Sequence, residues 1–92
     1  MSYYLKDPDA TSDYAIDWTS YLDGRTIVAS SWSAAPEESG GIAIGEASFD
    51  GARTAARVTG GIAGHAYSLA NHVTLSDGSG DDRSLTLRVE QR

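Results

Sequence analysis

Residues 65–90 read HAYSLANHVTLSDGSGDDRSLTLRVE and carry the clearest pattern in the chain. In residues 84–90, leucine and valine alternate with polar residues, which is the period of a half-buried β-strand. The same period of two runs through residues 65–76. Residues 77–81 between them are all Asp, Gly or Ser, which favour tight turns. This stretch therefore predicts two antiparallel strands joined as a hairpin.

Four earlier segments have the same character and are separated by turn-forming residues such as Asp23-Gly24 and Asp50-Gly51. These segments are residues 14–18, 26–33, 41–49 and 53–58. No window of 11 residues shows the sustained spacing of an amphipathic helix. Short strands separated by turns every 8 to 12 residues are typical of an immunoglobulin-like fold. We therefore predict an all-β protein, an immunoglobulin-like antiparallel β-sandwich of about six or seven strands.

The first twelve residues differ from the rest. Pro8 has no backbone donor and pushes Asp7 towards extended geometry, while Tyr3, Tyr4 and Leu5 form an apolar cluster just before it. Two interpretations stay open for residues 1–12: a terminus that frays or folds back over the sandwich, or an extended N-terminal arm that docks on a neighbouring subunit. The predicted domain organisation is an arm at 1–12 and a sandwich domain at 13–92.

Composition limits the possible functions. The 92 residues suffice for one hydrophobic core, and the absence of cysteine excludes disulfides and thiolate metal sites. The net charge of −6 and the scattered Lys and Arg residues disfavour nucleic-acid binding. The start of the chain lacks the features of a signal peptide, and no stretch has the apolar length of a membrane span. We expect a soluble protein made inside the cell, with no nucleic-acid or membrane partner.

No catalytic, cofactor-binding or metal site is predicted. The signature G-x-S-x-G is missing, and His65 and His72 lie seven apart in one predicted strand, so they should point to opposite faces. Asp77, Ser79 and Asp81 imitate the start of a calcium loop, but Asp82 and Arg88 stand where Gly and Glu are required. A turn whose Asp side chains cap backbone amides, with Arg83 near enough to balance their charge, is the better account.

Three polar or aromatic residues have an open role. Asn71 lies in the inward register of an apolar strand, so it should hydrogen-bond to a neighbouring strand or lie at an interface. Trp18 and Trp32 could be exposed platforms for sugars, but a sandwich with one Phe needs at least one of them in its core. A carbohydrate-binding module is therefore an alternative function.

Several short motifs, taken in order, resemble a family of small virion proteins of tailed bacteriophages, described as fibre-tail adaptor or tail-assembly proteins. The likeness covers residues 6–92. The motifs are Lys6-Asp7-Pro8, Asp13-Tyr14-Ala15-Ile16-Asp17-Trp18, Thr26-Ile27, Ser31-Trp32-Ser33, Gly60-Gly61, Ala63-Gly64-His65-Ala66-Tyr67 and Asp81-Asp82-Arg83-Ser84. The sequence departs from the family pattern at residues 35–45, where a Glu- and Gly-rich stretch replaces a β-branched strand.

The resemblance implies an immunoglobulin-like domain without enzymatic activity that is assembled in several copies into the virion. We therefore expect a ring-forming adaptor between tail or neck components and fibre or other virion proteins, with a capsid decoration protein as a further alternative. The interaction residues we expect are exposed ones at the terminus and at the hairpin tip. They are Tyr3, Tyr4, Leu5, Asp81, Asp82 and Arg83.

Overall fold

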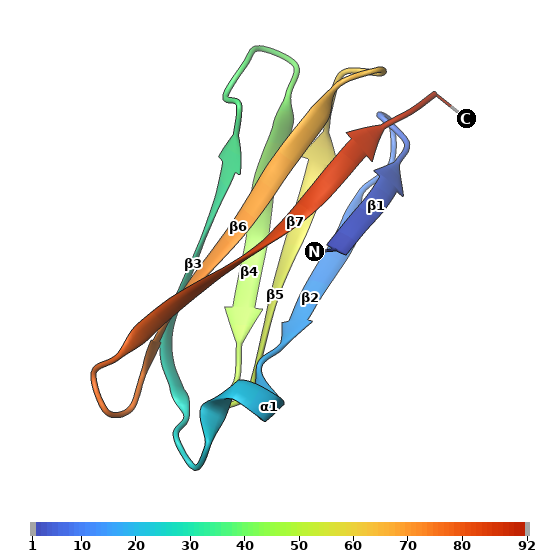
Figure 1. The fold of residues 1–92 in the computed structure, drawn as a ribbon. Helices are drawn as coiled ribbons and strands as arrows, with labels where there is room; N and C mark the ends of the chain where they lie inside the picture. Colours follow the sequence, from blue (N-terminus) through green and yellow to red (C-terminus); the bar gives the residue numbers. More distant parts are fainter. Residues whose placement is uncertain (1, 92) are drawn as a thin grey trace.

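The computed structural model describes residues 2–91, and within them the chain forms seven strands and one short helix (Figure 1). The strands are β1 (Ser2–Lys6), β2 (Ser12–Asp17), β3 (Ile27–Ala35), β4 (Ile42–Phe49), β5 (Arg53–Gly60), β6 (Ala66–Leu75) and β7 (Gly80–Val89). The helix α1 (Thr19–Leu22) is a single turn between β2 and β3, too short to give a periodic sequence signal. The all-β prediction is confirmed.

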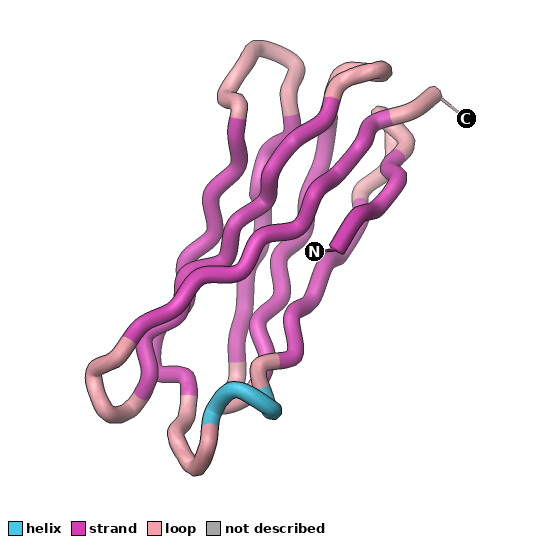
Figure 2. Tube along the Cα trace, in the orientation of Figure 1, coloured by secondary structure: helices cyan, strands magenta, loops and turns pink. Residues whose placement is uncertain are grey.

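The strands form two sheets that lie face to face, as the tube in Figure 2 shows. Sheet A has the order β1-β7-β6-β3, and sheet B has the order β2-β5-β4. Every pairing is antiparallel except that of β1 with β7. A sheet of the second, fifth and fourth strands packed on one of the third, sixth and seventh is the immunoglobulin arrangement. The predicted immunoglobulin-like sandwich is therefore confirmed.

The core lies between the sheets, and β6 shows how the sequence builds it. Its alternate residues from Tyr67 to Leu75 are buried, whereas the residues between them face solvent in whole or in part. The buried apolar cluster comprises Tyr14, Ile16, Trp18, Leu22, Ile27, Val58, Leu69, Val73, Leu75, Leu85 and Leu87. Each fully buried aliphatic side chain contributes about 1.5–3 kcal/mol. The period of two read from the sequence is therefore the inward face of the sheet.

Asn71 and Trp18 share a polar network inside this core. The Trp18 indole donates to Thr54 Oγ1 at 3.3 Å and to Asn71 Oδ1 at 3.1 Å. Asn71 in turn donates to Ser30 Oγ at 2.9 Å and to the Ser31 carbonyl at 3.0 Å. These contacts join β6 to its neighbour β3 and to β5 of the opposite sheet. The predicted hydrogen bonding of Asn71 is confirmed.

A tyrosine fixes the corner between β5 and β6. The Tyr67 hydroxyl accepts a hydrogen bond from the Ile62 backbone amide at 3.2 Å, five residues upstream. A tyrosine near the start of this strand, bonded back to the preceding corner, is a hallmark of immunoglobulin-like folds. Gly60 and Gly61 before it have φ of 78° and 109°, which residues with a side chain rarely adopt.

Residues 2–6 are extended, but they pair with the chain's own β7 rather than projecting from the sandwich. The Lys6 side chain turns inward and is 2% exposed. Its ammonium donates to the carbonyls of Asp7, Ala10 and Gly60 at 3.0, 2.7 and 2.6 Å. Within the chain, the terminus thus folds back onto the sandwich. Docking of residues 1–12 on a neighbouring subunit stays a prediction.

Candidate protein-interaction surfaces

The strand β1 forms one edge of sheet A and carries three of the expected interaction residues. Tyr4 and Leu5 are 42% and 49% exposed. The Tyr4 ring lies 5.5 Å from the ring of Tyr14 on β2, so it also covers the gap between the two sheets. The backbone of Tyr3 pairs with Thr86, whereas its side chain lies outside the described part of the structure. Among the side chains of β1 that the structure describes, that of Leu5 is therefore the most exposed.

Asp81, Asp82 and Arg83 do not lie at the hairpin tip, so their expected position is wrong. The turn occupies residues 76–79 and is closed by the Leu75 amide, which donates to the Ser79 carbonyl at 2.8 Å. Asp81 and Arg83 lie inside β7, opposite Val73 and Asn71 of β6. Asp and Gly have low strand propensity, and pairing with the long β6 overrides it here. The hairpin itself is confirmed.

The six expected residues nevertheless share one edge of sheet A. β1 pairs with residues 85–89 of β7 and leaves residues 80–84 with a strand partner on one side only, among the described residues. Asp81, Asp82 and Arg83 lie on this uncovered half of β7. Two separate stretches of sequence are thus brought together along one edge, which we call the β1–β7 edge.

Arg83 has a structural contact that the sequence does not reveal. Its guanidinium lies 4.5 Å from the centroid of the buried Trp18 ring, and it donates to the Asp17 carbonyl at 3.3 Å. A guanidinium over an indole face is worth about 0.5–1 kcal/mol when exposed and more when desolvated. Asp82 pairs with His72 Nδ1 at 2.7 Å across the outer face of the sheet. Part of the polar surface on this edge is therefore already engaged within the chain.

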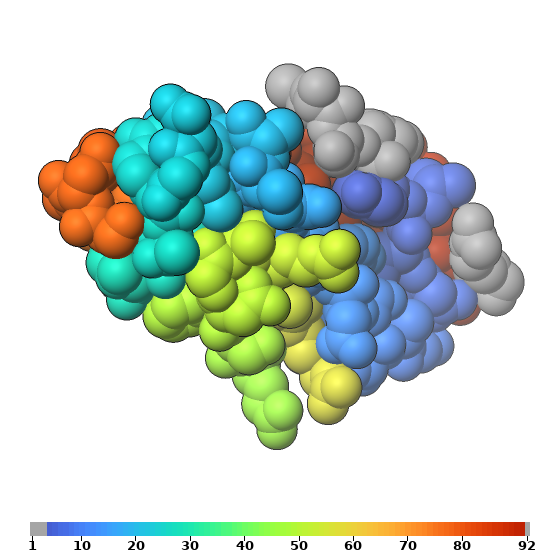
Figure 3. Space-filling model, turned by 90° about the horizontal axis from the view of Figure 1, so that it is seen from below, coloured from blue at the N-terminus to red at the C-terminus, as the bar shows by residue number. Residues whose placement is uncertain are grey.

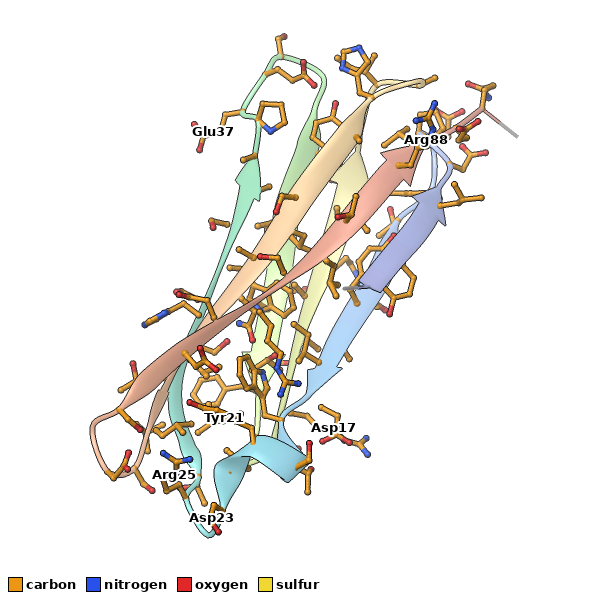
Figure 4. The ribbon with its side chains drawn as sticks, viewed as in Figure 1. Asp17, Tyr21, Asp23, Arg25, Glu37 and Arg88 are labelled. Atoms are coloured by element: carbon orange, nitrogen blue, oxygen red, sulfur yellow. The ribbon has the colours of Figure 1, made fainter. Side chains whose placement is uncertain are left out.

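Figure 3 views the sandwich from the end that carries α1. This end holds a second polar cluster, of which Figure 4 labels Tyr21 and Arg25. Arg25 donates to the Leu22 and Tyr21 carbonyls and forms an ion pair with Asp77 at 3.4 Å. Hydrogen bonds from the Ser79 hydroxyl and amide, together with Arg25, hold the pKa of Asp77 below its usual value. The capping role predicted for this turn is confirmed, but its charge is balanced by Arg25 and not by Arg83.

At the opposite end, Glu38 joins the β3–β4 loop to the β5–β6 corner. Its Oε2 accepts from the Tyr67 hydroxyl at 2.5 Å and lies 3.1 Å from His65 Nδ1. The hydrogen bond from Tyr67, followed by that from His65, lowers the pKa of the Glu38 carboxyl. His65 lies in the turn before β6. The expectation that it shares a strand with His72 is therefore wrong. Each histidine pairs with a carboxylate.

The third feature is a hollow of about 300 Å³ between β3 and β4, on the side of the sandwich away from the β1–β7 edge. It is lined by Trp32, Ser33, Ala34, Pro36, Glu37, Glu38, Ile42 and Ile44. The indole nitrogen of Trp32 is buried and has no hydrogen-bond partner in the structure. Trp18 is 0% exposed and so cannot stack on a sugar. Sequence reasoning missed this hollow because five of its eight lining residues come from residues 35–45, where the strand pattern is weakest.

Among residues 2–91, no group of three or more His, Cys, Asp or Glu residues is arranged to hold a metal ion. No helix of this part of the chain is long and apolar enough to cross a membrane. The described polar clusters tie loops and strands together.

The molecule is thus a small immunoglobulin-like domain whose surface offers strand edges and loop ends. Over residues 6–88 it matches the family described as podophage GP4 fiber-tail adaptor protein gp77. The chain belongs to this family, which makes it a structural adaptor of the tailed-phage virion. No curated protein matched the chain.

Proposed function

We propose that this chain is a non-enzymatic adaptor that joins a fibre to the tail or neck by holding a different virion protein at each edge of sheet A. The observation that carries the proposal is the strand order β1-β7-β6-β3. It places the β1–β7 edge and the strand β3 on opposite sides of one sheet, about 14 Å apart at the usual strand spacing. A rigid sheet with two separate edges can bind two partners at a fixed distance.

The β1–β7 edge supplies the first contact. Leu5 offers apolar surface, Asp81 and Asp82 offer charge, and the half of β7 not covered by β1 offers backbone groups. An apolar side chain bordered by polar residues is the usual composition of a protein interface. Tyr3, Tyr4 and Arg83 belong to the same proposed contact, with Tyr4 and Arg83 also supporting the fold.

Several copies of the chain surround the tail axis as a ring, since copies of one protein most often assemble with closed symmetry. The chain is made in the host cytoplasm and works in the virion without a cofactor. A capsid decoration protein is the alternative that copy number distinguishes. An adaptor ring requires on the order of ten copies per particle, whereas decoration requires hundreds.

Particles made without this chain test the proposal. They should have normal heads and tails but no attached fibres, and supplying the chain in trans should restore the fibres. Quantitative mass spectrometry of intact particles gives the copy number. Fibres that remain attached in its absence, or a copy number in the hundreds, would exclude the adaptor role.

A matched pair of variants tests the β1–β7 edge. Leu5→Asp should weaken fibre attachment with little effect on stability, because the Leu5 side chain is half exposed and is not one of the buried residues of the core. Ser68→Asp, at an exposed site in the middle of sheet A, is the control for added charge. If both variants attach fibres equally well, Leu5 is not part of the contact.

A further inference from the structure

Four strands end the two sheets, and three of them carry a feature that discourages pairing with another chain. β1 has the inward-pointing Lys6 and is followed by Pro8, and β2 has the charged pair Asp13 and Asp17. β4 has Glu46 and a register shift between Ile44 and Ala47. Charges, proline and bulges are the usual means of protecting a sheet edge. Three edges are thus protected against unwanted strand addition.

β3 is different. Its nine residues, IVASSWSAA, include no charge and no proline, and its one register shift lies at the start, between Ile27 and Ala29. From Ala29 to Ala35 it pairs regularly with β6, and among the described residues no strand pairs with its other side. A long, regular and uncharged edge is a ready template for a further strand.

The hollow beside β3 suits the side chains that such a strand would bring. Trp32 and Ala34 point to the inward face of sheet A, opposite Asn71 and Leu69 of β6, and both line the hollow. Ile42 and Ile44 of β4 form its other wall. An added strand would place every second side chain against these apolar groups. The remaining side chains would lie beside the exposed Ser31 and Ser33.

The charge of the residues around β3 indicates which kind of partner segment fits there. Residues 26–49 contain no Lys or Arg, and their three charges are Glu37, Glu38 and Glu46. Glu38 is engaged by Tyr67 and His65. Glu37 lies in the β3–β4 loop, two residues after the end of β3, with its side chain directed away from the sandwich (Figure 4). A second copy of the chain would bring a further net charge of −6 to this acidic side. A partner segment with a basic residue fits it better.

We propose that β3 accepts an extended segment of another virion protein by strand addition, with alternating apolar and small residues and a basic residue beside Glu37. The inference rests on the proposed adaptor function and names the second of its two contacts. It assigns Trp32, Ala34 and Ile42 as the pocket for the apolar side chains of that segment.

Overlapping 12-residue peptides covering the fibre and tail proteins encoded with this chain are the probe. The test variant is Ser31→Lys/Ser33→Lys, which places two lysines on the exposed edge strand. The control is Ala66→Lys/Ser68→Lys, which places the same charge on exposed positions of the central strand β6. At least one peptide should bind the natural chain. Its affinity for the test variant should be tenfold or more lower, and its affinity for the control variant should equal that for the natural chain. Bound peptide should also slow amide exchange at residues 29–35.

A charge pair refines the test. Glu37→Gln should weaken binding of the same peptide about threefold at low salt, whereas Asp9→Asn, at an exposed acid elsewhere, should leave it unchanged. Absence of any binding peptide, or binding that the two lysines on β3 do not affect, overturns the inference. Analytical ultracentrifugation gives a second contradicting outcome. A natural chain that is a dimer and a Ser31→Lys/Ser33→Lys variant that is a monomer would show that a second copy of the chain, and not another virion protein, occupies β3. The adaptor role is tested separately, by whether particles made without this chain lack fibres. If the peptide test fails and these particles still lack fibres, strand addition at β3 is excluded while the adaptor role stands.

Discussion

Trp18 and Asn71 meet in the middle of the sandwich, where the indole nitrogen of Trp18 donates to Asn71 Oδ1 at 3.1 Å. Trp18 follows β2 of sheet B, and Asn71 belongs to β6 of sheet A, so this bond spans the core. Both residues are 0% exposed. Buried polar groups are costly when unpaired, and this pair is satisfied only in the observed alignment of the two sheets.

Asn71→Leu should lower the free energy of unfolding by about 2–4 kcal/mol. It leaves the buried Thr54 hydroxyl without its acceptor, leaves Trp18 with only its longer bond to Thr54, and removes the donor that Asn71 supplies to the Ser31 carbonyl. Urea denaturation measures the change. His72→Gln, at the next and exposed position, is the control and should have a small effect. An Asn71→Leu protein as stable as the natural chain would show that the network contributes nothing.

Lys6→Met should lower the free energy of unfolding by about 2–3 kcal/mol, since three carbonyls lose their buried donor. Leu5→Met, on the exposed neighbour, should have little effect. Equal stability of the two variants would contradict the role of the ammonium as the clamp between β1 and the β1–β2 loop.

Lys6 also predicts a pH effect. Burial lowers its pKa from 10.5, against the opposing charges of Asp7 and Asp9. The folded chain therefore loses this proton at lower pH than the unfolded chain does, and the unfolded state binds more protons between the two pKa values. The stability of the natural chain relative to Lys6→Met should then rise with pH in that interval below 10.5. If the stability of the natural chain relative to Lys6→Met falls with pH instead, burial is not the main influence on the Lys6 pKa.

Tyr67→Phe should lower the free energy of unfolding by about 1–2 kcal/mol, because the Ile62 amide loses its acceptor and Glu38 loses a donor. The Glu38 pKa lies below 4.5 in the folded chain, so the stability it adds is present above 4.5 and is lost as pH falls through the folded value. Unfolding curves from neutral to acid pH should show a weaker acid dependence in Tyr67→Phe. An unchanged dependence would exclude this bond as the cause.

Gly61→Ala should destabilise the chain by more than about 2 kcal/mol, since a Cβ there would lie 2.6 Å from Val89 Cγ2 at a φ of 109°. Gly64→Ala has a similar positive φ of 85° but no atom within 4 Å of the added Cβ. It should therefore cost about 1 kcal/mol, from the backbone alone. Thermal unfolding of both variants separates the cost of the clash with Val89 from the cost of backbone strain. An equal loss of stability in Gly61→Ala and Gly64→Ala would contradict the predicted clash.

The hairpin β6–β7, the inward role of Asn71 and the sandwich class follow from the period of two, because each buried face repeats every second residue. β1 escaped detection, since its inward positions include the charged Lys6, whose burial depends in part on the Gly60 carbonyl, 54 residues away in the sequence. Asp81–Arg83 were misplaced because pairing with β6 extends a segment of poor strand propensity. The hollow beside Trp32 depends on the approach of two strands, which no local pattern encodes.

The most direct test of the account is photo-crosslinking in intact particles, with a benzophenone amino acid placed at Leu5 in one sample and at Ser33 in another. These positions lie on β1 and β3, at opposite edges of sheet A. The two positions should capture two different virion proteins, one of them a fibre protein and the other a tail or neck protein. Capture of one and the same protein at both positions, or of neither a fibre nor a tail protein, would contradict it.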